Sequence, residues 1–65
     1  MTKTAKINAA RAFGSVAFAN GLMAAPAGDT NLMDLLAGEP VGGNGVKIMQ
    51  AWLSGWTQAN LAGVL

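Results

Sequence analysis

The segment AWLSGW, residues 51–56, places both tryptophans of this 65-residue chain four positions apart. On an α-helix, residues at this spacing lie one turn apart on the same face. The two largest side chains therefore form one stripe, which belongs either to the core or to a binding surface. We expect Trp52 and Trp56 to pack in the core. Because a domain of this size buries two indole rings with difficulty, Trp56 is also a candidate for partner contact.

The helix around this segment is predicted to run from about residue 46 to residue 62, with Gly63 ending it. Its sides differ clearly in polarity. The apolar side is made of Ile48, Met49, Trp52, Leu53, Gly55, Trp56 and Ala59, and the polar side of Lys47, Gln50, Ser54, Thr57 and Gln58.

Two further helices are predicted before it. The first spans about residues 5–22, with Thr4 as its N-cap and Pro26 beyond its end. The second spans about residues 30–37, with Asp29 or Thr30 as N-cap and Gly38 as C′ glycine. The chain lacks the alternation typical of strands. It therefore predicts an all-α fold, a single small helical domain over residues 1–65 with two principal helices and one short helix.

Small residues link the two long helices. They recur on one face of each helix, as Ala10, Gly14, Ala17 and Gly21 in the first and Ala51, Gly55 and Ala59 in the last. A glycine inside a helix costs about 0.5–1 kcal/mol relative to alanine, so its presence favours close helix packing. We predict that the two stripes face each other and that Phe13, Phe18 and the two tryptophans flank the crossing.

The composition argues against several kinds of chemistry. The chain has no Cys and no His, so neither disulfides nor a structural zinc site is expected. Its three carboxylates are scattered and its serines have no base, which argues against acid–base and nucleophilic catalysis. The glycines of residues 42–45 lack the spacing of a phosphate-binding loop, and we interpret them as a connector. We expect a non-enzymatic protein without cofactor, metal or small-molecule substrate.

Charge is sparse, with a net value of +1, and it is unevenly placed. The first segment is basic through Lys3, Lys6 and Arg11, which are candidates for contact with nucleic acid. The middle of the chain is acidic through Asp29, Asp34 and Glu39. There a protein partner would meet this acidic patch of Asp29, Asp34 and Glu39. Apolar residues expected to be exposed, namely Leu32, Met33 and Leu36, would add to the contact.

The basic start, the uncharged stretch up to Asp29 and the sequence APA at residues 25–27 together imitate a secretory signal. Polar residues and glycines interrupt this stretch, and no run of about 18 apolar residues that could span a membrane is present. We expect a cytoplasmic protein that does not contact a membrane.

The sequence AWLSGWTQA, residues 51–59, resembles the W-L-x-G-W-x-x-A segment of ribosome modulation factor. Arg11 and Ala12, followed by Gly14, Ala17 and Gly21, are similar to the glycine pattern of that family's first helix. The chain departs from the family in being nearly neutral, in lacking the Pro-Tyr element and in carrying an additional segment over residues 26–47. The resemblance implies packed helices with Trp and Gly at their crossing and, as a function, binding to ribosomal RNA.

The sequence thus predicts non-enzymatic binding of a macromolecule. By the resemblance, the partner is the ribosome or rRNA, contacted by the basic residues of the first segment. The alternative is a small phage-encoded inhibitor that binds a protein complex, for example a host defence complex such as CRISPR-Cas. A third class is a structural subunit that self-associates as a homo-oligomer.

Overall fold

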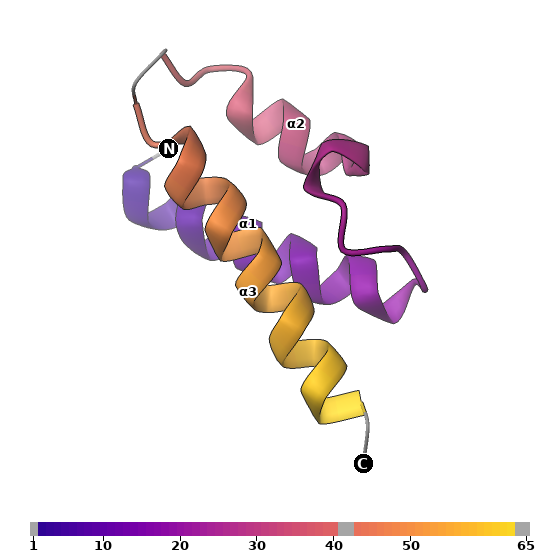
Figure 1. Cartoon of the computed structure of the whole chain (residues 1–65). Coiled ribbons are helices and arrows are strands. Elements are labelled where there is room, and N and C mark those ends of the chain that lie inside the picture. Colours follow the sequence, from indigo (N-terminus) through magenta and orange to yellow (C-terminus); the bar gives the residue numbers. More distant parts are fainter. Residues whose placement is uncertain (1, 41–42, 64–65) are drawn as a thin grey trace.

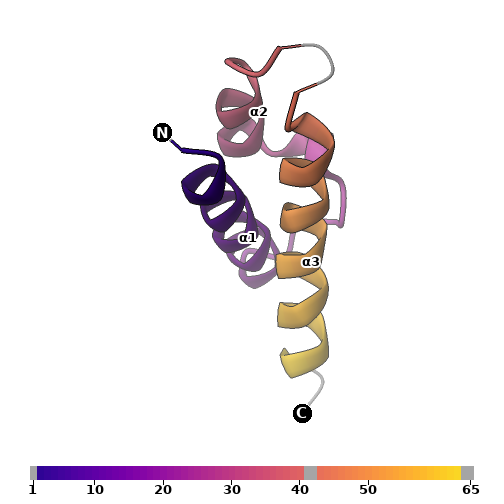
Figure 2. The same cartoon turned by 90° about the vertical axis from the view of Figure 1, so that its left-hand side faces the viewer.

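The computed structural model describes residues 2–40 and 43–63. This part of the chain forms α1 (Lys3–Ala19), a short 3₁₀ helix η1 (Pro26–Gly28), α2 (Thr30–Leu36) and α3 (Gly45–Gly63), without any strand. The two long helices cross, and α2 lies against them on the side where both begin (Figures 1 and 2). The predicted all-α bundle of two principal helices and one short helix is confirmed.

The first helix begins earlier than predicted. Its N-cap is Thr2, whose Oγ1 accepts a hydrogen bond from the backbone N–H of Ala5 at 3.1 Å. Thr4, the expected N-cap, lies inside the first turn instead. Both threonines fit the sequence rule for a cap, so the pattern alone does not decide between them.

This helix also ends earlier than predicted, at Ala19 instead of residue 22. Gly21 adopts a left-handed conformation with φ of 76°, and the N–H of Leu22 donates to the carbonyl of Ala17 at 2.9 Å. This is the Schellman arrangement, which satisfies the last free carbonyls of a helix. Gly21 therefore terminates α1 and does not continue its small-residue stripe.

The other helix bounds are close to the prediction. Asp29 caps α2, since its Oδ1 accepts hydrogen bonds from the N–H groups of Asn31 at 2.9 Å and Leu32 at 3.4 Å. Gly38 follows the C-cap but lacks the positive φ expected of a C′ glycine. The helix α3 extends the predicted range by one residue at each end. Of the predicted connector at residues 42–45, residue 42 lies outside the described part, and Gly45 already belongs to α3.

The crossing of α1 and α3 is built on glycines, as predicted. A Cβ atom added to Gly14 would overlap the carbonyl oxygen of Trp52, and one added to Gly55 would overlap the carbonyl oxygen of Arg11. Each glycine thus lies directly against the backbone of the opposite helix. This close approach explains why these two positions carry no side chain.

The core is small and draws on all three α-helices. Its buried apolar residues are Ala10, Ala17, Leu32, Ile48, Ala51 and Trp52. Trp52, only 1% exposed, is the largest of them, which confirms its predicted place in the core. Leu32 brings α2 into the same cluster, so the short helix is an integral part of the domain.

Candidate partner-binding surface

The buried tryptophan is held by a carboxylate that α2 positions. The indole Nε1–H of Trp52 donates to Oδ2 of Asp29 at 2.7 Å, while Oδ1 of the same carboxylate caps α2. One side chain thus satisfies the only polar group of the largest core residue and orients the short helix. Asp29 is half-buried and both of its oxygens are occupied within the fold. These contacts give it a structural role.

The second tryptophan lies at the edge of the core. Trp56 is half-buried, and its Nε1–H donates to the carbonyl of Leu22 at 2.9 Å. Its ring packs against Phe18 in a T-shaped arrangement, with centroids 5.3 Å apart and planes at 86°. Trp56 therefore fastens the segment after α1 onto α3 and leaves part of its ring open to a partner.

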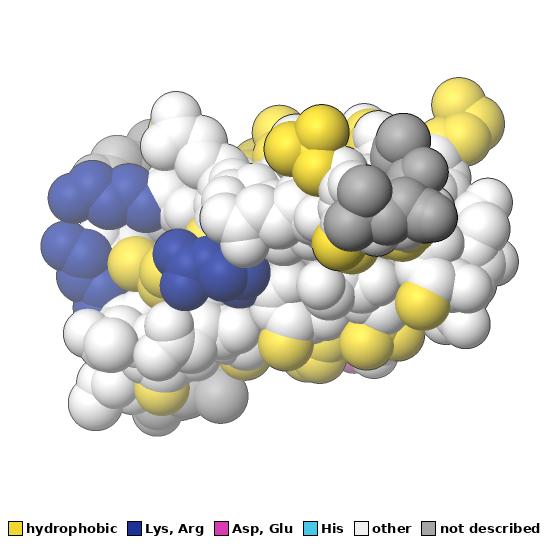
Figure 3. Space-filling view, turned by 90° about the horizontal axis from the view of Figure 1, so that it is seen from below, with side chains coloured by type: hydrophobic (Ala, Val, Ile, Leu, Met, Phe, Trp, Pro, Cys, Tyr) yellow, Lys and Arg dark blue, Asp and Glu magenta, His cyan; other side chains and the backbone are white. Residues whose placement is uncertain are grey.

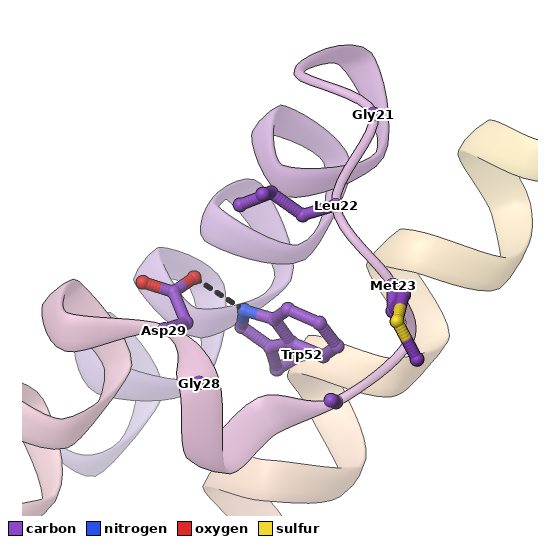
Figure 4. A pocket seen from close by; sticks show the side chains of 7 residues that line it. Gly21, Leu22, Met23, Gly28, Asp29 and Trp52 are labelled. Carbon is purple, nitrogen blue, oxygen red and sulfur yellow. Dashed lines mark hydrogen bonds between the residues drawn. The ribbon is translucent and has the colours of Figure 1, made fainter.

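That segment borders an apolar groove of about 390 Å³. Figure 4 shows Trp52 with its hydrogen bond to Asp29, and Leu22 and Met23 along the chain that passes beside the ring. Met23 is 79% exposed and Leu22 is 52% exposed. Sequence reasoning missed this groove, because no local pattern marked Leu22 or Met23 as surface residues that would be brought beside Trp52.

The predicted acidic patch is largely used inside the fold. Glu39 forms a salt bridge with Lys6 at 3.3 Å, and Asp29 holds Trp52. Leu32, expected on the surface, is fully buried, because it is the residue by which α2 enters the core. Asp34 alone of the acidic candidates is an exposed side chain on α2.

The basic candidates divide into two groups. Lys6 is half-buried in its pair with Glu39, so its charge is matched within the fold. Lys3 and Arg11 are exposed, and in the described part of the chain neither pairs with a carboxylate. Arg11 instead donates to Oδ1 of Asn8 at 3.4 Å.

Lys47, on the first turn of α3, is exposed like Lys3 and Arg11, although it lies far from them in the sequence. The pKa of Lys3 is lowered from its ordinary value by a hydrogen bond to the Lys47 amine, then by repulsion from its charge and by desolvation. The first turns of α1 and α3 contain no acidic residue that would offset these charges. Two lysines from distant parts of the sequence thus meet where both long helices begin.

Seen from below, the Lys and Arg side chains gather at one end of the molecule (Figure 3). Hydrophobic side chains spread over the opposite part of this face, and Asp and Glu are almost absent from it. We call the exposed cations Lys3, Arg11 and Lys47 the basic cluster. Its chemistry suits a partner with several negative charges.

Comparison with known protein families, with curated proteins and with solved structures found no match to this chain. Within the described residues, no helix is long and apolar enough to cross a membrane. The same residues hold no group of three or more side chains suited to bind a metal ion.

Proposed function

We propose that this protein binds RNA without catalysing a reaction, and that its partner is the ribosome or rRNA. The observation that carries the proposal is the gathering of Lys and Arg side chains at one end of the molecule (Figure 3), where the exposed cations Lys3 and Lys47 repel each other without a described carboxylate partner. A phosphate placed between them would relieve that repulsion and release counterions. Arg11 adds a planar donor group that suits phosphate oxygens.

The resemblance of residues 51–59 to ribosome modulation factor points to the same partner. Its Trp and Gly positions coincide with Trp52, Gly55 and Trp56, which build the crossing here. The basic cluster would supply the electrostatic contact. Because the cluster has few charges, we expect modest affinity for RNA. We also expect shape complementarity or base stacking to contribute to the binding.

The test is the salt dependence of binding to rRNA fragments, measured by fluorescence anisotropy. Three phosphate contacts predict a slope of log K against log salt of roughly −2 for single-stranded RNA. Replacing Lys3 and Lys47 by Gln should reduce the slope to about −0.7, the value for one remaining contact. Lys6→Gln serves as the matched control, because that lysine is already paired with Glu39.

Circular dichroism of each variant would establish that the helices are kept. Unchanged affinity and slope in the double Gln variant would overturn the proposal, as would binding that does not respond to salt. A steep loss in Lys6→Gln, with the fold intact, would place the contact outside the basic cluster.

The groove beside Trp52 favours a second candidate, a protein partner that an inhibitor of a protein complex would bind. Exposed Leu22 and Met23 border this groove, and apolar rims of this kind suit an anchoring side chain from another protein. Binding of a protein in this groove should persist in the presence of RNase and at high salt. It should be lost on Met23→Asp and kept in the Lys3 and Lys47 double Gln variant, the reverse of the pattern expected for RNA.

A further inference from the structure

The outer face of α3 carries apolar side chains that no described element covers. Val46 is 68% exposed, Leu53 37% and Leu61 67%. Figure 1 shows α3 crossing in front of α1, with no other element in front of it. Gln50 and Thr57, both exposed, lie between these residues on the same side of the helix.

The spacing of these five residues is that of a seam between two helices. Successive members are separated by four, three, four and four positions, close to the alternation found in helix pairs. No charged residue belongs to the row. Such a face suits a second helix with a matching row, which makes another copy of α3 a natural occupant.

Four of the five positions of the row are paired symmetrically, and the fifth, Leu53, lies next to the centre of symmetry. About a centre between Leu53 and Ser54, position 46 is the mirror of position 61, and position 50 is the mirror of position 57. An antiparallel pair of α3 helices would therefore place Val46 on Leu61 of the second copy and Gln50 on Thr57, with the two Leu53 side chains beside the axis. Two-fold interfaces require this self-complementarity.

The charges of α3 agree with the antiparallel arrangement. At a rise of 1.5 Å per residue, the two Lys47 residues would lie about 20 Å apart along the axis, beyond the screening length of about 8 Å at physiological salt. Each Lys47 would approach the last turns of the opposite helix. Those turns contain no basic residue of their own to offset the negative end of the helix dipole.

We propose that the outer face of α3 is the interface of a two-fold homodimer in which two α3 helices pair antiparallel. The seam is one helix wide and two of its five positions are polar, so the dimer is weak and depends on concentration. Of the basic cluster, Lys47 would border this interface, whereas Lys3 and Arg11 lie on α1, outside the row. The inference rests on the row along α3 and stands whether or not the cluster binds RNA.

The absence of cysteine from the sequence permits a direct test by single-cysteine cross-linking. Leu53→Cys should form a disulfide-linked dimer on mild oxidation, because the residue lies beside the axis. Val46→Cys alone should not, since its two copies would be about 22 Å apart. A mixture of Val46→Cys and Leu61→Cys should cross-link to each other.

Asn8→Cys, exposed on α1, gives the background of random collisions. Sedimentation equilibrium of the unmodified chain should show monomer and dimer, and Leu53→Glu should shift the population to monomer while circular dichroism stays unchanged. Cross-linking of Val46→Cys with itself would overturn the antiparallel arrangement. A chain that remains monomeric at millimolar concentration would overturn the dimer.

Discussion

At the scale of single residues, the Lys3–Lys47 contact makes a prediction about titration. Since the Lys47 amine lowers the pKa of Lys3, Lys47→Gln should raise that pKa toward its ordinary value. An NMR titration of the lysine side chains would measure the change. Lys6→Gln should leave the Lys3 titration in place, and a pKa of Lys3 indifferent to Lys47 would contradict the proximity of these two lysines.

The lowered pKa of Lys3 also determines the direction in which stability changes with pH. Because the folded chain binds the Lys3 proton less tightly than the unfolded chain, the unfolded state holds more protons between the two pKa values. Stability therefore rises as pH increases from the folded to the unfolded pKa of Lys3. The effect is small, since the amine is fully exposed and screened by solvent.

Gly14 allows a second prediction at this scale. Gly14→Ala should destabilise the domain by about 1–3 kcal/mol, the usual cost of overpacking, although alanine favours helices. Thermal unfolding followed by circular dichroism measures this. Gly28→Ala is the matched control, because a Cβ there meets no atom within 4 Å and should change stability by no more than about 1 kcal/mol. Equal stability of both variants would contradict the close crossing.

At the scale of elements, the docking of α2 depends on the contacts of one carboxylate. Asp29→Ala removes the N-cap and leaves the Trp52 indole N–H without its acceptor. We expect a loss of about 1–3 kcal/mol and a fall in Tm of roughly 5–15 °C. Asp34→Ala removes the same charge from an exposed position of the same helix and should shift Tm by only a few degrees. Similar Tm values for the two variants would contradict this role of Asp29.

The elements also show what sequence patterns can predict here. The glycine crossing could be predicted because small residues recur about one turn apart along each helix. This spacing can be read from each helix alone. The distant partners of three charged residues, namely Trp52 for Asp29, Lys47 for Lys3 and Glu39 for Lys6, could not be predicted, because each lies far away in the sequence and is brought near only by the docking of the helices. The end of α1 was missed because Gly21 fitted both the small-residue stripe and a helix terminator, and only the backbone conformation separates these roles.

At the scale of the whole molecule, acidic and basic side chains differ in how they are used by the fold. Two of the three acidic side chains, Asp29 and Glu39, are used within the fold, whereas three of the four basic ones form the open cluster. The surface is therefore more positive in effect than the net charge of +1 implies. This distribution makes a polyanionic partner compatible with a nearly neutral chain.

The small shared core predicts that the whole molecule unfolds as one unit. A domain of this size has about 3–5 kcal/mol of core stabilisation, and a buried Leu→Ala substitution costs about 2–5 kcal/mol. Leu32→Ala, although it lies on the short helix, should therefore unfold α1 and α3 as well. Loss of the helical circular dichroism signal together with a shift in Trp fluorescence would show this.

Leu22→Ala is the control for that substitution, because it removes the same atoms from a side chain that is half exposed, and its Tm should change little. The two probes should report one transition in the unmodified chain as well, since Leu32, Ile48 and Trp52 belong to a single cluster. A Leu32→Ala variant that keeps α1 packed on α3 would contradict this. It would mean that the glycine crossing is stable by itself and that α2 is an addition to it.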